Sequence, residues 1–311
     1  MLKYTLRRVL YVIPILFGVT LICFLLFNVA GGDPAAQAAG KYATAEQIRT
    51  IRHEMGLDKP LPLQYWDYLK QVVTFDFGRS WSTKQNISEM FLEGVGPSLT
   101  ITFPGFVISL LLTIPLALLL GYKRDSLLDK FSMFICLAMI SISSLVYILA
   151  GQYFLSYKMN LFPISGWDSS WSGRWEYALL PILIMVVLSI GGNVLFFRTL
   201  FIEEMHKDYV RTARSKGLSN KTVLTKHILR NALIPIITLT VLQIPFLILG
   251  SLLIESFFGI PGLGGITVNA INNADFPVIK AMVVILTILY TIFNLLSDLL
   301  YAVVDPKVRL E

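Results

Sequence analysis

Three carboxylates lie in or beside strongly apolar segments, where an ionised side chain is costly. Asp298 falls within the last apolar run, and Glu255 and Asp275 flank a glycine-rich segment. Asp298 could relay protons, and Glu255 or Asp275 could meet a cation or the amino group of a substrate. The alternatives are a polar clamp between helices for Asp298, and capping and loop solvation for the other two. The residues that share one helical face with Asp298, at intervals of four, three and four, are Asn294, Tyr301 and Asp305.

Several kinds of chemistry lack the residues they would need. No Gly-x-x-x-x-Gly-Lys-Ser/Thr sequence occurs, so the usual phosphate-cradling loop for ATP is missing. The three histidines are far apart in the sequence, both cysteines fall inside apolar runs, and no Ser, His and Asp group has supporting spacing. The sequence therefore predicts a protein that is not an enzyme and has no metal or cofactor. Its energy would come from another polypeptide or from a gradient.

The most polar stretch is a basic segment, residues 198–230, which carries eight Lys and Arg between two apolar runs. Such a segment cannot lie in hydrocarbon, and its positive charge is typical of the cytoplasmic side of a membrane. Residues 202–215 predict a helix, and Gly217 supplies the left-handed position that ends one. Ser219 starts a second helix, which we expect to continue until Pro235 removes a donor. The segment is either a helix, glycine corner, helix element held by another protein, or a basic loop that sets topology and touches phospholipid headgroups.

The elements that must position these residues are membrane helices. The chain has 311 residues, of which 55% are apolar and 15% charged. Six runs have at least 21 residues, enough to span a bilayer. The first is too long for a cleavable signal peptide and is interpreted as a retained anchor. The fold class is therefore an all-α polytopic bundle with six transmembrane helices and both termini on one side. The runs are residues 9–30, 97–122, 131–157, 177–197, 231–254 and 281–304.

The distribution of basic residues gives an orientation. With the N-terminus inside, the inner segments carry 16 Lys and Arg in 56 residues and the outer segments carry 10 in 111. The higher inner density follows the positive-inside rule and places both termini in the cytoplasm. The net charge of +6 is not gathered on a soluble surface, so we expect a lipid membrane and no nucleic acid as its surroundings.

Residues 31–96 would then form an outer, extracytoplasmic domain. Thr44 with Gln47 forms a capping box that opens a helix closed at Gly56, and residues 63–74 and 87–92 predict two more helices. The domain is either a platform for a substrate-carrying protein or a folded cap with its aromatic residues at the lipid interface.

Further on, Trp167, Trp171 and Trp175 recur every four residues and indicate an interfacial belt if that loop is helical. Prolines interrupt several spans, and residues 255–265 predict a tight re-entrant turn. Asn193 and Gln243 are polar positions that could face a partner or a water-filled path, although packing is the commoner role.

Several of these stretches together resemble a known family. Residues 208–219 (Asp-Tyr-Val-Arg-Thr-Ala-Arg-Ser-Lys-Gly-Leu-Ser) and 227–235 are similar to the cytoplasmic loop of ABC importer permease subunits. The branch is that for dipeptides, oligopeptides or nickel, and its first, B-type peptide permease subunit is the most similar. Residues 33–34, 44–48, 56–65, 255–265, 275–277 and 294–306 resemble the same branch. The general pattern begins Glu-Ala-Ala where this chain has Arg211-Thr-Ala, so Arg211 must be paired differently.

The resemblance implies a type I importer fold and a coupling helix held by an ATPase subunit. The ATPase-coupling residues it implies are Tyr209, Arg211, Thr212, Ala213, Lys216, Gly217, Leu218, His227, Asn231 and Pro235. The residues assigned to the translocation path or gate are Asn193, Gln243, Glu255, Pro261, Gly262, Gly264, Asp275 and Asp298.

The regions implied are residues 1–30 with the first span, the outer domain 31–96, the core 97–304 with its coupling loop 198–230, and the C-terminus 305–311.

The partners implied are a second, homologous permease subunit in a heterodimer, two ATP-binding subunits that carry the ATP and Mg, and an extracytoplasmic binding protein. The location is a bacterial inner membrane, and the cargo is a di- or oligopeptide, a nickel chelate or glutathione. Two other classes of protein are alternatives. A gradient-driven secondary transporter would use Asp298 and Asp275 as ion sites, and an intramembrane enzyme would need a catalytic pair that is absent.

Overall fold

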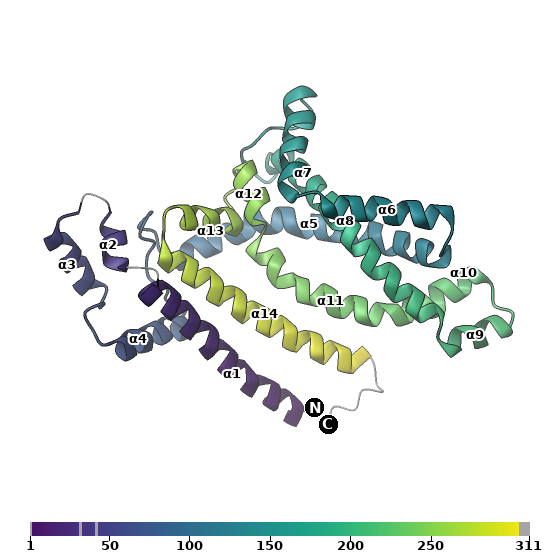
Figure 1. Ribbon diagram of the computed structural model, residues 1–311, viewed down its shortest axis with the longest axis horizontal. Coiled ribbons are helices and arrows are strands. Elements are labelled where there is room, and N and C mark those ends of the chain that lie inside the picture. Colours follow the sequence, from purple (N-terminus) through teal and green to yellow (C-terminus); the bar gives the residue numbers. More distant parts are fainter. Residues whose placement is uncertain (1, 31–32, 41–42, 305–311) are drawn as a thin grey trace.

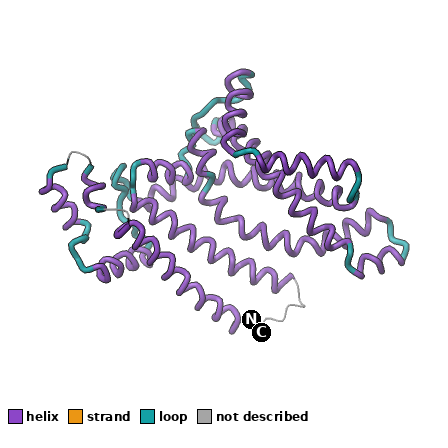
Figure 2. Tube along the Cα trace, viewed as in Figure 1, coloured by secondary structure: helices purple, strands orange, loops and turns teal. Residues whose placement is uncertain are grey.

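The computed structural model describes residues 2–30, 33–40 and 43–304 (Figure 1). Within these ranges the chain is helical and contains no strand (Figure 2). The N-terminal part comprises α1 (Leu2–Leu25) with a π-helical extension (Leu26–Ala30), α2 (Pro34–Ala39), α3 (Ala45–Glu54), α4 (Leu61–Thr74) and α5 (Ile87–Tyr122). The middle comprises α6 (Leu127–Ser141), α7 (Ser144–Gly151) with a π-helical extension (Gln152–Lys158), α8 (Arg174–Met205), α9 (Asp208–Ser215) and α10 (Asn220–Thr222). The remainder comprises a π-helical segment (Val223–Ile228), α11 (Leu229–Leu249), α12 (Leu252–Phe258), α13 (Leu263–Asn272) and α14 (Phe276–Val304).

Among the described residues, four helices are long and apolar enough to cross a membrane, and α6 with α7 makes a fifth span if that bent pair counts as one. These correspond to five of the six predicted runs. The first run forms α1 and its π-helical extension, in which the apolar helix Ile13–Asn28 is shorter than the four spans.

The run predicted over residues 131–157 is helical, but it is not one straight helix. It is broken between Ser141 and Ser144, where the helix axes turn by 90°. Ile142 and Ser143 adopt extended conformations there, and the serines around them compete locally for backbone hydrogen bonds. The hydroxyl of Tyr147 donates to the carbonyl of Met139 at 3.0 Å and so satisfies an acceptor near the break.

The prolines do not interrupt the spans as expected. Pro104 and Pro115 lie inside α5, and Pro235 and Pro245 lie inside α11, which continues to Leu249. The prediction that the second helix of the basic segment would end at Pro235 is therefore wrong. In an apolar environment each unpaired backbone group costs free energy. A helix that loses one donor at a proline is therefore still more stable if it continues, because its other backbone groups stay hydrogen-bonded.

The helices predicted between residues 44 and 74 form at the predicted places. Thr44 and Gln47 form the predicted capping box, and Gly56 takes the left-handed conformation after α3. The second predicted helix is α4, which buries Tyr68 and Val72 in a cluster that also contains Phe24 of α1.

The predicted third outer helix, residues 87–92, is not separate. It forms the first turns of α5, which runs without a break through Gly94 and Pro97. A Cβ at Gly94 would lie 2.7 Å from the side chain of Leu263, so this glycine allows close packing of α5 against α13. Tertiary packing here outweighs the low helix propensity of glycine.

The core is arranged as a series of buried clusters along the bundle. One joins α1, α4 and α5 to α14 and includes Met282 and Val284; a second lies between α8 and α12; a third lies at the base of α9. Figure 1 shows α2 to α4 at one end of the molecule and α9 with α10 at the other, with α5, α8, α11 and α14 running between them.

Candidate functional site

The basic segment folds into an elbow (residues 208–231), made of α9, the corner at Gly217, α10 and the π-helical segment that leads into α11. The prediction of one helix over 202–215 is wrong, because α8 ends at Met205 and α9 begins at Asp208. The physical reason is local. The hydroxyl of Tyr209 donates to Glu204 at 2.6 Å, and Lys207 pairs with the same carboxylate, so both side chains fold back across the break.

The corner itself has the predicted conformation. Gly217 has φ +75°, and a Cβ placed there would meet no atom within 4 Å. Ser219 then caps the second helix, because its hydroxyl accepts from the backbone N–H of Thr222 at 3.3 Å. Any other residue type at position 217 would therefore be strained by the positive φ of the backbone and not by contact with neighbouring atoms.

One face of the elbow is buried. Val210 and Ala213 of α9 and Val223 and Ile228 beyond the corner are at most 5% exposed. They pack in one cluster with buried residues of α5, α8 and α11, of which Phe201 is fully buried. The elbow is thus fixed by apolar packing to three long helices, α5, α8 and α11.

The opposite face of the elbow is exposed. The exposed members of the predicted coupling set are Arg211, Thr212, Lys216, Gly217, Leu218 and Asn231. Arg211 lies 3.7 Å from Asp208, an exposed pair of little energetic weight. Leu218 is 39% exposed at the corner, an apolar tip surrounded by basic residues.

The remaining predicted coupling residues lie inward. Ala213 is buried, and Tyr209, His227 and Pro235 are half-buried. Burial, and then the hydrogen bond to Glu204, raise the pKa of Tyr209 to about 12, so its hydroxyl remains a donor at cellular pH. These four residues shape and attach the elbow and leave little surface for a partner.

A buried ion pair braces the helix that leads into the elbow. The guanidinium of Arg198 on α8 donates twice to the carboxylate of Asp129 on α6, at 2.6 Å each. Asp129 also accepts from the backbone N–H of Asp125 at 2.9 Å. Sequence reasoning missed this pair, because the two residues are 69 positions apart and each looked like an ordinary charge in an inner loop.

At the other end of the bundle, Glu255 is 1% exposed and acts as an internal acceptor. Its carboxylate accepts from the backbone N–H groups of Ser251 at 3.0 Å, Gly264 at 2.7 Å and Gly265 at 3.1 Å. A Cβ at Gly264 would lie 2.7 Å from the backbone of Ser251, so glycine is required for this approach. Gly262 is likewise closed in by the same carboxylate. The hydrogen bonds of Glu255 are those of capping, the alternative that the sequence left open.

Asp275 has the same character. It is 2% exposed and accepts from the hydroxyl of Ser80 at 2.5 Å and from the backbone N–H groups of Trp81 at 3.1 Å and Ser82 at 3.2 Å. It therefore fixes the loop before α5 to the corner between α13 and α14. Its contacts are those of loop solvation.

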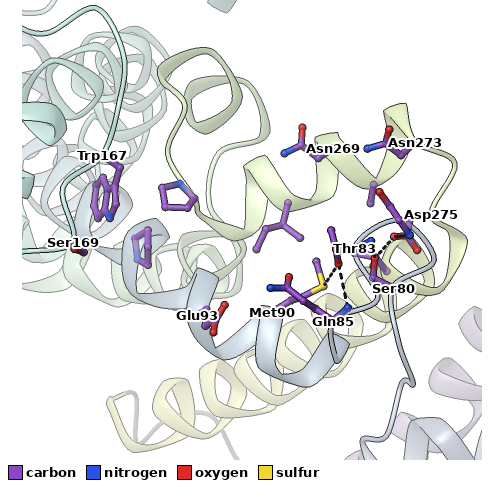
Figure 3. Close-up of a pocket in the computed structure, with 16 residues that line it drawn as sticks. Ser80, Thr83, Gln85, Met90, Glu93, Trp167, Ser169, Asn269, Asn273 and Asp275 are labelled. Carbon is purple, nitrogen blue, oxygen red and sulfur yellow. Dashed lines mark hydrogen bonds between the residues drawn. The ribbon is translucent and has the colours of Figure 1, made fainter.

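Asp275 lies at one edge of a cavity of about 450 Å³, at the end of the bundle opposite the elbow. Figure 3 shows the amides of Asn269 and Asn273 above it, Glu93 below and Trp167 at the far side. Pro261 lies in its wall. The lining mixes apolar surface with amides, hydroxyls and one exposed carboxylate, a combination suited to a polar organic molecule or a protein loop.

The other predicted path residues are scattered. The amide of Asn193 donates to the hydroxyl of Ser109 at 3.1 Å and joins α8 to α5, while Gln243 is exposed on α11. The side chains of Asp298, Tyr301 and Asp305 lie outside the described residues. Within the described part of the chain, no three His, Cys, Asp or Glu residues could hold a metal ion.

The tryptophan spacing does not reflect one helical face, because α8 begins only at Arg174 and the first two tryptophans precede it. The guanidinium of Arg174 lies over the rings of Trp167 and Trp171, at 5.6 Å and 5.2 Å from their centres. Trp171 and Trp175 meet edge to face with centroids 5.8 Å apart. The three residues thus form a small cluster around one cation.

Comparison with known proteins gives a consistent result. Residues 113–310 match the family described as binding-protein-dependent transport system inner membrane component, and residues 1–96 match the N-terminal family of such membrane components. The glutathione transport system permease protein GsiC of Salmonella typhimurium is 34% identical over 309 residues, which cover 99% of each chain. The Escherichia coli protein of that name is 33% identical over the same share. This chain belongs to the family of binding-protein-dependent transport system inner membrane components, and it is an ABC importer permease subunit of the peptide and glutathione branch.

Proposed function

We propose that this chain forms half of the translocation path of an ATP-driven importer and transmits the movement of an ATPase subunit through its elbow. The observation that carries the proposal is the elbow's two faces. The buried face packs against α8 and α11, and the opposite face is exposed and basic, with Leu218 at its corner. A partner that grips the exposed face would move two long helices together, which suits a bundle that alternates between two shapes.

We further propose the arrangement in the membrane. Six spans, with α1 as the first and the bent pair as the third, place both termini in the cytoplasm of a bacterial inner membrane. The elbow then lies on the cytoplasmic side and α2 to α4 lie outside. Two observations support this. Basic residues are denser in the inner segments, and α9 and α10 lie at the opposite end of the molecule from α2 to α4 (Figure 1).

The partners follow from this arrangement. A second permease subunit of the same family would complete the path, two ATPase subunits would hold ATP and Mg, and a binding protein would deliver cargo at the outer face. The chain itself would hydrolyse nothing. The elbow, residues 208–231, offers the inner docking surface, and the outer domain with the cavity of Figure 3 offers the outer one.

For the cargo, we propose a short peptide. The relatives at 33–34% identity are named for glutathione, which is itself a tripeptide, so glutathione is the first alternative. A nickel chelate is a second alternative within the branch. The internal hydrogen bonds of Glu255 and Asp275 leave neither carboxylate free to select a cargo, which fits a system whose binding protein makes that choice.

A gradient-driven transporter is the rival class, with Asp275 as an ion site. The hydrogen bonds that occupy Asp275 count against it, because an ion site needs oxygens free to bind. Transport in vesicles that contain this chain and a proton gradient, but no ATPase, would favour the rival.

The test is purification of the chain with its native neighbours. We expect an ATPase to co-purify, and Gly217→Pro to abolish its binding, because proline cannot adopt a positive φ. Gly217→Asn is the matched control, since asparagine tolerates the left-handed region and the space around the Cβ is open. An ATPase retained equally by the wild type and Gly217→Pro would show that the motor docks elsewhere.

A further inference from the structure

A second cavity lies between the outer domain and the outer ends of α1 and α14, apart from the elbow and from the cavity of Figure 3. Its volume is about 290 Å³, and α1, α3, α4, the segment of residues 77–81 and α14 contribute to its walls. Neither the coupling role nor the delivery of cargo described above requires this cavity.

A cation without a counter-charge reaches this cavity from the first turns of α14. Lys280 donates to the amide oxygen of Asn28, and its ammonium lies 5.7 Å from the ring centre of Tyr68. Among the described residues, no carboxylate pairs with this ammonium. An ammonium has three donors. Lys280 therefore keeps both unused donors and an uncompensated charge, which together favour an anion as the occupant of the cavity.

A second group in the same wall also lacks a partner. Tyr68 is 8% exposed, and its hydroxyl is the only buried side-chain polar atom among the described residues with no hydrogen bond. Leaving a buried hydroxyl unpaired is costly. Burial raises the pKa of Tyr68 above its ordinary value, so the hydroxyl stays protonated and can donate a hydrogen bond. Because the Lys280 ammonium lies over the ring that carries this hydroxyl, the two residues together offer an anionic oxygen a charge and two kinds of donor.

The other charged groups around the cavity do not cancel this preference. Asp67 is already paired with Lys59 at 2.6 Å. Glu54 is exposed at the rim, and Arg79, also exposed, makes no ion pair among the described residues. Two cations without an ion pair, Lys280 and Arg79, therefore face one carboxylate without an ion pair, Glu54.

We propose that this pocket binds a phosphate group, which accepts hydrogen bonds from the ammonium of Lys280 and the hydroxyl of Tyr68. A lysine binds phosphate as a compact point charge. The neighbouring surface of α1 is apolar and exposed at Ile22 and Leu25, and a lipid tail could lie against it. The phosphate is therefore that of a phospholipid headgroup or a free phosphate ion, two sources with the same chemistry.

The test uses the complete transporter purified in detergent. One arm measures phospholipid retained per complex by native mass spectrometry, and the other measures stabilisation by inorganic phosphate after lipid removal. Retained phospholipid identifies the headgroup as the source, and stabilisation by phosphate with no retained lipid identifies the free ion. Sodium acetate is titrated in parallel, and we expect it to have a much weaker effect than phosphate.

Tyr68→Phe is the decisive variant, because it removes a hydroxyl that has no partner within the chain. We expect its stability without ligand to be unchanged or higher, while its affinity for the phosphate group falls roughly tenfold or more. Lys280→Gln should abolish binding. The matched control is Lys70→Gln, which removes a lysine that also lies near an aromatic ring, 5.8 Å from Trp66, but outside the cavity. We expect the control to bind as the wild type does.

Three results would overturn the proposal. The first is binding of lipid and phosphate by Tyr68→Phe and Lys280→Gln at wild-type strength. The second is the absence of both retained lipid and stabilisation by phosphate in the wild type. The third is equal stabilisation by acetate and phosphate, which would show a response to ionic strength or to any anion. None of these results depends on ATPase docking, so they do not bear on the elbow.

Discussion

Replacement of Glu255 by glutamine tests whether this buried carboxylate holds the fold or contacts cargo. Its three backbone hydrogen bonds come from Ser251, Gly264 and Gly265. Glutamine has one acceptor oxygen, so at least one of these N–H groups would face an amide NH₂. A lost hydrogen bond to a charged group costs about 1.5–3 kcal/mol. For a chain of this size, that loss lowers the melting temperature by roughly 2–5 °C.

The assay is thermal unfolding of the purified complex, paired with transport in vesicles. Glu93→Gln is the matched control, because Glu93 is an exposed carboxylate on the wall of the cavity in Figure 3. We expect the control to unfold at the wild-type temperature, and Glu255→Gln to unfold early and to recover transport at lower temperature. A Glu255→Gln complex of unchanged stability with transport abolished would refute the structural role and assign the carboxylate to cargo.

Three further predictions concern other parts of the bundle. Asp129→Asn should destabilise the complex by about 3 kcal/mol, because it leaves the buried Arg198 without its partner. The double variant Asp129→Asn, Arg198→Met should lose less stability than the sum of the two single changes. Chemical denaturation of the wild type and the three variants measures this, and additive losses would show that the pair is unimportant. Tyr147→Phe should cost about 1 kcal/mol by releasing the Met139 carbonyl at the bend, and no loss of melting temperature would mean that the bend does not depend on this bond. Cys136, at 4% exposure, should resist maleimide until the protein unfolds, and rapid labelling of the native complex would contradict the packing of α6 on α8.

Local features could be predicted from the sequence because their causes lie within a few residues. The capping box of Thr44 and Gln47 and the positive φ of Gly217 were predicted and are observed. Both depend on contacts or backbone preferences that neighbouring residues determine. The five helical spans beyond α1 were predicted for a similar reason, since length and apolarity alone decide whether a segment can cross a bilayer.

The tertiary structure decided what distant residues do for one another. Arg198 and Asp129 form a pair across two helices, and Glu255 finds its donors only because α13 folds back against α12. Local preference was also overruled by packing, as in the merging of residues 87–92 into α5. The sequence by itself determined a basic, glycine-hinged segment between apolar runs and the family to which the chain belongs. Only the fold decided which face of that segment is buried, because burial depends on helices that lie up to a hundred residues away in the chain.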